Sequence, residues 1–259
     1  MAQSQRIALL AILLLAAILR LTGLDWDGYQ HHHPDERYIT WVATTVEFPS
    51  LGELVQLKTW QPTTSLFNPF HWPPEAGSEG IVVLQGEPRD FAYGHVPRYL
   101  GALSTRATEQ VSPWLAPLLP ADWPLVSDVL NYSSRIEFHH LTAVGRMLTA
   151  LFDVGTVLFI FLLGRLLFSP GAGLLAAAFV ALAVLHIQLA HFFTSDPFMT
   201  FFVVAAVYFM VSAQVMATQT QPVVSYTRVA VSLVLAAIMT GLAIGSKFNS
   251  VLLVLPLVW

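Results

Sequence analysis

Long runs of apolar residues constrain this chain more than any other feature of its sequence. A helix needs about 20 consecutive apolar residues to cross the hydrocarbon core of a bilayer. Candidate runs occupy residues 7–24, 143–168, 172–190, 197–217 and 229–244, and a further run begins near 251 and continues to 259. The sequence therefore predicts an all-α polytopic membrane protein, in which these runs form a bundle of transmembrane helices.

The overall composition agrees with lipid as the solvent of this chain. Hydrophobic residues make up 55% of it and charged residues 11%, with a mean hydropathy of +0.63. These values are too apolar for a soluble domain with an ordinary charged surface. The net charge is only -4 and Lys and Arg form no cluster, so nucleic acid is not indicated as a partner. The absence of cysteine excludes disulfides, thiolate metal sites and cysteine nucleophiles.

The spacing of the apolar runs predicts three parts. Residues 1–24 form the first transmembrane helix, residues 25–142 a long extracytoplasmic loop, and residues 143–259 transmembrane helices two to six. The loop is rich in Pro, Trp, His and Tyr, and its prolines prevent a straight spanning helix. Because aromatic side chains favour the boundary between lipid and water, we expect short interfacial helices within the loop.

The two ends of the chain leave alternatives open. The first run follows Arg6 and is only moderately long, so a cleaved signal peptide is the alternative to a retained helix. No small-residue cleavage pattern follows Arg20, which favours the retained helix. Because the last run stops at Trp259 in the middle of a span, we expect this chain to be the truncated, N-terminal part of a longer protein.

Basic residues in the short connections indicate the orientation. Placing Arg6, Arg165 and Arg228 in the cytoplasm leaves only Lys247 in a short outer turn, as the positive-inside rule prefers. This orientation puts the long loop and the turn around Asp196 on the extracytoplasmic face. We therefore expect a multi-pass protein of the plasma membrane with its site on that face.

The first polar motif opens the long loop, where histidines 31–33 precede Pro34, Asp35 and Glu36. Adjacent carboxylates just above a bilayer can deprotonate a hydroxyl or bind a divalent cation, and Pro34 fixes the backbone before them. The alternative is a solvated acidic loop with Arg37 as its counter-ion. A metal site made only of the three histidines is less favoured, because consecutive side chains point in different directions.

The second polar motif lies between the third and fourth runs. Asp196, directly before Pro197, has the pattern of a helix N-cap, and a carboxylate fixed there is also held rigidly for binding. His186 and His191 lie where the third helix leaves the membrane. Interfacial histidines commonly serve as hydrogen-bonding spacers, and His191 is the stronger candidate of the two for contact with a substrate.

Further ionisable residues lie in or beside the apolar runs. Arg146 and Asp153 are seven residues apart, on roughly one face of the second helix. Ionisable groups at that depth are costly and face a cavity or a partner, although Arg146 can also snorkel to lipid headgroups. Lys247 is well placed to meet a lipid phosphate, and the alternative is an ordinary interfacial lysine. Acidic and cationic groups are thus both expected at the outer face.

Five segments in this order resemble a known group of membrane enzymes, the polyprenyl-phosphate-dependent glycosyltransferases of the GT-C fold. The resemblance is to family 39, which includes protein O-mannosyltransferases and the aminoarabinose transferase of lipid A. The segments are HPDER at 33–37, FAYGHVPRY at 91–99, GRMLTALFD at 145–153, HFFTSDP at 191–197 and GLAIGSKFN at 241–249. They span nearly the whole chain, and family members continue through several more helices.

The resemblance also implies roles for individual residues. Asp35 corresponds to the family's essential loop carboxylate, with Glu36 beside it. Arg146 matches the arginine that opens the second helix, and Lys247 matches a lysine near the donor phosphate. Three further residues lie in the matching segments and join the candidate substrate-binding residues: Tyr93, His191 and Asp196.

These observations lead to one hypothesis and two rivals. The hypothesis is an inverting hexosyl or pentosyl transferase that moves a sugar from a polyprenyl phosphate to a protein, lipid or glycan, with Asp35 as general base and membrane lipids around it. The sequence identifies no particular cofactor, and Asp35 and Glu36 are candidates for holding a divalent metal. A transporter or flippase would use Asp153, His191 and Arg146 as an ion path. A non-catalytic scaffold would use the outer loop to bind a partner.

Overall fold

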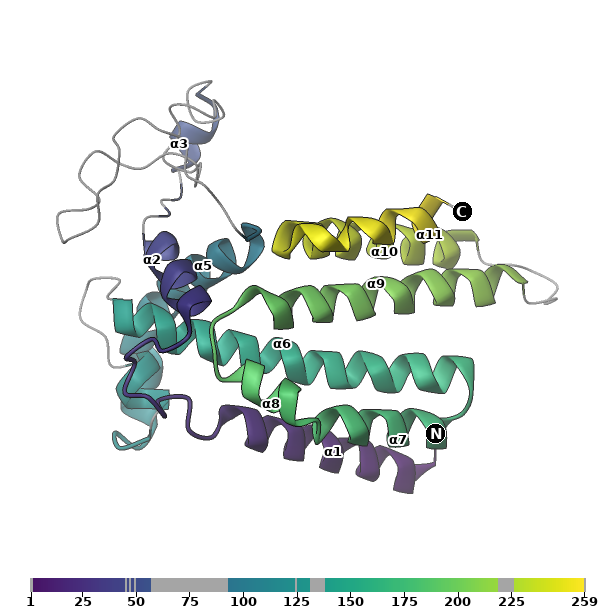
Figure 1. Ribbon diagram of the computed structural model, residues 1–259, viewed down its shortest axis with the longest axis horizontal. Helices are drawn as coiled ribbons and strands as arrows, with labels where there is room; N and C mark the ends of the chain where they lie inside the picture. The colour runs from purple at the N-terminus through teal and green to yellow at the C-terminus, as the bar shows by residue number, and fades with distance from the viewer. Residues whose placement is uncertain are drawn as a thin grey trace. The chain divides into compact units, whose positions relative to one another are not determined.

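The computed structural model describes residues 2–44, 46, 48, 50–56, 93–123, 125–130, 138–218 and 226–258. Within these residues every regular element is a helix, which confirms the all-α prediction (Figure 1). The chain folds as two compact units. We call Met1–Gly28 with Arg146–Trp259 the membrane unit, and Tyr29–Gly145 the loop unit. The part boundaries at residues 24 and 142 remain sequence-based predictions.

The membrane unit consists of roughly parallel helices. Four are long and apolar enough to cross a membrane, and a bent pair makes up a candidate fifth span, so the multi-pass prediction is confirmed. The four are α1 (Gln3–Leu21), α6 (Phe138–Leu167, whose first residues belong to the loop unit), α9 (Ser195–Thr218) and α10 (Tyr226–Ser246). In Figure 1 the order across the unit is α1, α7, α6, α9 and α10.

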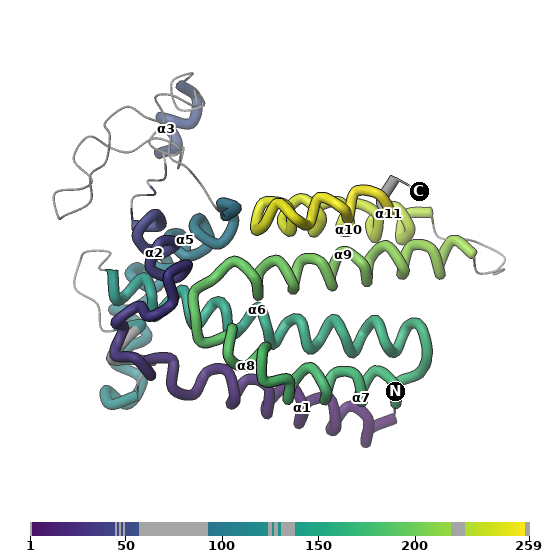
Figure 2. Tube along the Cα trace, viewed as in Figure 1, coloured from purple at the N-terminus to yellow at the C-terminus, as the bar shows by residue number. Residues whose placement is uncertain are grey.

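The predicted third span is not one straight helix. It is divided into α7 (Pro170–Ala181) and α8 (Val184–Ala190), which meet at an angle of 58° (Figure 2). Neither Leu182 nor Ala183 at the break is a helix-breaking residue. The side chain of Arg20 instead donates to the carbonyl groups of Val180 and Ala181 at the end of α7, as described below. It thereby supplies a donor to the Ala181 carbonyl at the break.

The chain after α10 also departs from a simple span. Lys247 has an extended backbone and follows the end of α10. The next element is a 3-10 helix, η3 (Phe248–Leu253), and α11 (Val254–Val258) continues from it. The predicted run from 251 to 259 therefore begins inside η3. Trp259 lies outside the described residues.

Small residues set the distance between α6 and α7. A Cβ atom added at Gly173 would lie 2.6 Å from the carbonyl oxygen of Phe161, and one added at Gly164 would lie 2.9 Å from the Cα of Gly173. Real side chains do not approach that closely, so these glycines allow the two helices to touch. The N-cap Ser169, whose Oγ accepts from the Ala172 N–H at 3.2 Å, holds the short link between them.

Aromatic rings fill the space between α6 and α9. Phe152 and Phe159 of α6 meet Phe201 of α9 edge to face, with ring centroids 4.9 and 5.5 Å apart. Such contacts add about 0.5–1.5 kcal/mol each to the burial of the rings. The interface between α6 and α9 is therefore packed by aromatic side chains.

The loop unit contains shorter helices. They are α2 (Pro34–Thr44), α3 (Leu51–Leu54), α5 (Val96–Leu115), η1 (Ala116–Leu118) and the π-helix η2 (Leu125–Leu130). α5 packs against α2 with a partly polar face that includes Arg98 and Thr105, whereas Leu103, Val111 and Trp114 are exposed. The interfacial position of these helices remains a prediction. Two stretches of the predicted loop, 57–92 and 131–137, lie outside the described residues and include Phe91 and Ala92 of the matching segment.

Candidate active site

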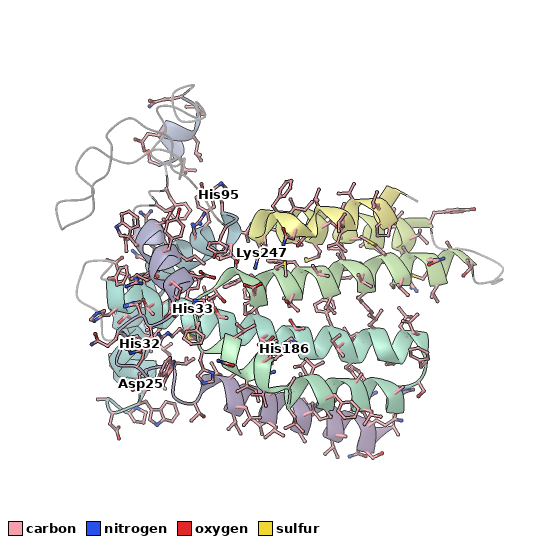
Figure 3. All side chains as sticks on the ribbon, in the orientation of Figure 1. Asp25, His32, His33, His95, His186 and Lys247 are labelled. Atoms are coloured by element: carbon pink, nitrogen blue, oxygen red, sulfur yellow. The ribbon has the colours of Figure 1, made fainter. Side chains whose placement is uncertain are left out.

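Lys247 and Asp196 form an ion pair in the membrane unit. Asp196 lies in the first turn of α9, and Lys247 follows the last residue of α10 (Figure 3). The Lys247 Nζ lies 2.7 Å from Oδ1 of Asp196, and the side chains are 28% and 31% exposed. Two of the predicted binding residues are therefore brought together, and both can be reached from outside the bundle.

Buried hydroxyl groups flank this ion pair along the chain. Thr194 lies two residues before Asp196 and Ser250 three residues after Lys247, and the Ser250 N–H donates to the Lys247 carbonyl at 3.1 Å. Among the described residues, neither Thr194 Oγ1 nor Ser250 Oγ has a hydrogen-bond partner. Buried donors without an acceptor are costly, and α9 begins at this point with its positive dipole end. Together with the Lys247 ammonium, these groups suit an anion such as a phosphate.

His191 joins the end of α8 to the segment after α1. Its Nδ1 lies 2.7 Å from the Ile187 carbonyl oxygen and its Nε2 lies 2.9 Å from the Thr22 carbonyl oxygen. Both partners are carbonyl oxygens, so a ring nitrogen that bonds to either one must be the donor. The ring of neighbouring Phe192 meets Trp26 edge to face, which fixes the same corner. The described contacts of His191 are structural, and its predicted role in substrate binding stays a prediction.

Arg146 is fully buried and holds a carboxylate that the sequence did not single out. Its NH1 and NH2 donate to Oδ1 and Oδ2 of Asp27 at 2.8 and 3.0 Å, and NH1 also donates to the Leu24 carbonyl at 2.6 Å. This two-pronged geometry is the strongest that arginine makes with a carboxylate. Arg146 therefore anchors the segment after α1 to the start of α6 within the membrane unit. Its predicted contact with a donor phosphate stays a prediction.

A second buried pair joins Arg20 to Asp153, with an Nε–Oδ2 distance of 2.5 Å. His186 of α8 contacts the other carboxylate oxygen, with 2.6 Å between Nδ1 and Oδ1 (Figure 3). Sequence reasoning placed Asp153 correctly among residues that need a partner, but it missed Arg20. The signal was present, since Arg20 is the one charged residue inside the first apolar run.

In the loop unit, Asp35 and Glu36 lie in the first turn of α2. Asp35 is partly exposed and Glu36 is fully buried. The Asp35 N–H donates to Nδ1 of His33 at 3.2 Å, so this histidine caps the helix. Because Glu36 is buried, Asp35 is the more accessible of the two for contact with a substrate.

A divalent cation on Asp35 and Glu36 stays a prediction. Consecutive residues of a helix point about 100° apart, so two neighbouring carboxylates do not converge on one ion without further ligands. Among the described residues, no group of three or more His, Asp or Glu side chains is placed to hold a metal.

The segment before α2 has an unusual backbone. Tyr29 and His31 both adopt left-handed conformations, with φ angles of 59° and 53°, which cost energy for any residue other than glycine. His31 is buried, its Nε2 lies 2.6 Å from Oγ1 of Thr142, and its ring packs on Phe138 at 4.4 Å. These contacts hold the strained backbone directly ahead of Asp35.

Arg98 is the buried cation of the loop unit. Its NH1 donates to the Tyr93 carbonyl at 2.9 Å and lies 3.2 Å from Nδ1 of His95, and its guanidinium lies 5.5 Å from the centre of the Tyr38 ring. Burial and the nearby Arg98 charge lower the pKa of His95 to about 4, so His95 is a neutral acceptor at physiological pH. Burial lowers the pKa of Arg98 to about 10 and raises that of Tyr99 to about 12. The predicted residue Tyr93 takes part here through its backbone.

The fold and these side chains define a multi-pass helical membrane protein, in which Asp35, Asp196 and Lys247 lie at helix ends. A family model identifies the enzyme class. The model for dolichyl-phosphate-mannose-protein mannosyltransferase matches residues 104–259, and the chain belongs to this family. Comparison with curated proteins and with solved structures gives no match.

Family membership confirms the resemblance to GT-C enzymes of family 39. The chain is a membrane glycosyltransferase of the class that takes its sugar from a polyprenyl phosphate, and the family implies a protein acceptor. This finding favours the enzyme over the transporter and the scaffold. The match includes Arg146, Asp153, Asp196 and Lys247, whereas Asp35 and Glu36 precede it.

Proposed function

We propose that this protein transfers a hexose or pentose from a polyprenyl phosphate to a hydroxyl group of a protein on the extracytoplasmic face, with inversion at the anomeric carbon. The observation that carries the proposal is the Lys247–Asp196 pair, which lies in the family match and is open to solvent. Buried hydroxyls of Thr194 and Ser250 without described partners flank it.

Lys247 supplies the positive charge for the donor phosphate. In the structure its ammonium is held by Asp196, a carboxylate that orients the lysine and that a phosphate oxygen can join or replace. When the bond between the sugar and the phosphate oxygen breaks, negative charge grows on the departing phosphate. A preplaced cation stabilises that charge more than it stabilises the bound donor, and it therefore accelerates the reaction.

Asp35 is the proposed general base. It takes the proton of the acceptor hydroxyl as the oxygen attacks the anomeric carbon from the side opposite the phosphate. One carbon–oxygen bond forms, the bond to the phosphate breaks, and polyprenyl phosphate leaves with both electrons of that bond. The support is the family resemblance together with the partial exposure of Asp35 at a helix start. Glu36 is buried beside Asp35, so we do not assign it the role of the base.

Variants of Lys247 and Asp35 test the two roles separately. In transfer assays with a radiolabelled polyprenyl-phosphate sugar, Lys247→Met is expected to lower kcat about 10²–10³-fold, with partial recovery in Lys247→Arg. Asp35→Asn is expected to lower kcat about 10²–10⁴-fold while donor binding persists. Asp25→Asn, at an exposed carboxylate of the membrane unit, is the matched control and is expected to keep normal turnover. Near-normal turnover of Asp35→Asn would remove the base assignment.

The sidedness of the reaction is tested with single cysteines, because the chain has none of its own. Asp25, Val55 and Phe168 are exposed positions. With the proposed orientation, a membrane-impermeant maleimide labels Asp25→Cys and Val55→Cys on intact cells, and labels Phe168→Cys only after permeabilisation. Labelling of Val55→Cys only after permeabilisation would place the loop unit in the cytoplasm and contradict the proposed face.

A further inference from the structure

Arg20 makes more contacts than an ion pair requires. Besides Asp153, its guanidinium donates to the Ala181 carbonyl at 2.9 Å from NH1 and to the Val180 carbonyl at 3.1 Å from NH2. NH1 also lies 3.3 Å from the carbonyl oxygen of Ala16 on its own helix. The side chain is fully buried. All three guanidinium nitrogens therefore have acceptors, and two of these acceptors belong to the end of α7.

The Ala181 carbonyl is a group that the helix break exposes, whereas the Val180 carbonyl also accepts from the Ala183 N–H at 3.2 Å. The last carbonyls of any helix lack partners within that helix, and in a membrane protein an unsatisfied carbonyl costs several kcal/mol because lipid offers no donor. α7 ends at Ala181 inside a run that is apolar enough to span, so its end needs donors from elsewhere. The guanidinium of Arg20 on α1 provides such donors and thereby lowers the energetic cost of the break.

Asp153 and His186 hold the other side of the same break. Asp153 of α6 receives Arg20 on one oxygen and His186 on the other, and His186 lies in the first turn of α8. The carboxylate is almost completely buried, so removing either partner is costly. One carboxylate thus connects α1, α6 and α8, with the end of α7 held through Arg20.

We propose that Arg20, Asp153 and His186 are positioning residues that hold α7 and α8 at their bend. α8 leads directly into His191, which bonds to Thr22, and then into Asp196 at the start of α9. Because α8 is short, its direction decides where this corner lies. The three residues thereby place the partner of Lys247 without touching a substrate.

An ordinary stabilising ion pair is the alternative, and a charge exchange separates the two. Arg20→Asp with Asp153→Arg restores one cation and one anion, but it points a carboxylate at the carbonyls of Val180 and Ala181. A mere ion pair predicts recovery in the double variant. The positioning role predicts no recovery, because an anion cannot donate to carbonyl groups.

The test measures the bend directly in the full chain in lipid nanodiscs. Spin labels on Leu21→Cys and Gln188→Cys, both exposed, report the distance between α1 and α8. Labels on Gln214→Cys and Val231→Cys report α9 and α10 as a control. Arg20→Met is expected to broaden and shift the first distance while the control pair stays unchanged. An unchanged α1–α8 distance in Arg20→Met would overturn the proposal, as would recovery of that distance in the charge-exchanged variant.

His186 provides a milder variant in case changes at Arg20 prevent folding. His186→Ala removes the contact with Asp153, whereas the amide of His186→Gln can still donate to it. We expect the α1–α8 distance to shift in the first and to return toward wild type in the second. Equal distances in both and in wild type would remove His186 from the group.

The activity readout rests on the proposed function, but the distances do not. In transfer assays, Arg20→Met and His186→Ala are expected to lower kcat about 10²-fold at unchanged acceptor KM, since displacement of a site by about 1 Å has that size of effect. Normal kcat with a shifted bend would overturn the positioning role. If the wild-type chain shows no transfer while the distances respond as expected, the proposed function is wrong. The claim that Arg20, Asp153 and His186 hold the bend between α7 and α8 is then still supported.

Discussion

The two units treat buried charge differently. In the membrane unit, Arg20, Arg146 and Lys247 each meet a carboxylate from a distant part of the chain, at 2.5–2.8 Å. In the loop unit, buried Arg98 donates to a backbone carbonyl, lies beside a neutral imidazole and contacts an aromatic ring. Cations of the membrane unit thus join distant parts of the chain through carboxylates, and the buried cation of the loop unit also contacts neutral groups.

The difference follows from the surroundings of each unit. A lone charge among apolar helices is very costly, and the attraction between opposite charges is strong where water is excluded. A pair therefore becomes the least costly way to keep a cation in the bundle. In the loop unit, carbonyl dipoles and an aromatic ring also help to stabilise the charge of Arg98. The cations of the membrane unit consequently also determine which helices lie together.

The largest expected effect comes from breaking a buried pair of the membrane unit. Arg146→Met leaves Asp27 buried with its charge, which is expected to cost about 3–5 kcal/mol. The double variant Arg146→Met with Asp27→Leu removes both charges and is expected to recover most of this loss. Thermal unfolding in detergent, followed by the fraction of protein that stays monodisperse, measures both. A single variant as stable as wild type would show that pairing is not what the bundle requires.

A smaller effect is expected from His31 in the loop unit. His31→Ala removes the hydrogen bond to Thr142 and the packing on Phe138 that hold the left-handed backbone, at an expected cost of about 1–3 kcal/mol. The exposed neighbour supplies the control, because His32→Ala is expected to change stability by less than about 0.5 kcal/mol. Hydrogen exchange of α2, compared at one pH, locates the loss. Equal protection of α2 in both variants would show that His31 does not hold this segment.

The apolar runs predicted α1, α6, α9 and α10 because each run is long enough to be read without knowledge of its neighbours. The bend between α7 and α8 was not predictable in that way. Its residues, Leu182 and Ala183, carry no turn signal. Arg20, which holds the bend, lies 133 residues before Asp153 and 161 residues before Ala181 in the chain. Long-range pairing decides the local structure there.

The candidate site shows the same limit. The charges of Asp196 and Lys247 could be recognised from their positions beside apolar runs, but their ion pair joins residues 51 positions apart. The sequence did not single out Asp27, although both of its carboxylate oxygens accept from Arg146. Residue types and positions were legible in the sequence, whereas the choice of partners depends on how the helices pack.

The stability of the loop unit is expected to depend on pH through His95, with a smaller effect than the two variants above. The pKa of His95 is lowered from 6.5 to about 4 in the folded chain. Between these two pH values, His95 is therefore mostly neutral in the folded chain and mostly protonated in the unfolded chain. Stability from this source is therefore complete above pH 6.5 and falls as the pH drops toward 4. His95→Gln cannot titrate, and its Tm is expected to fall less than that of wild type between pH 7 and pH 5. Equal falls would show that His95 gains its proton freely in the fold.

The smallest expected effect concerns the exposed apolar face of α5. Trp114 is 80% exposed, so Trp114→Ala removes little packing and is expected to change the free energy of unfolding by less than about 0.5 kcal/mol. If this face lies in the membrane interface, the ring sits among lipid headgroups and acyl chains. Lipids with brominated chains would then quench the fluorescence of Trp114 in the wild type. We expect the Trp114→Ala variant to lack this quenched component. Trp114→Phe removes the same fluorophore and keeps an apolar ring, so it separates loss of signal from loss of contact. If iodide quenches the Trp114 fluorescence and brominated lipids do not, this face of α5 lies in water. Lipid would then contact the transmembrane helices and not the exposed face of α5.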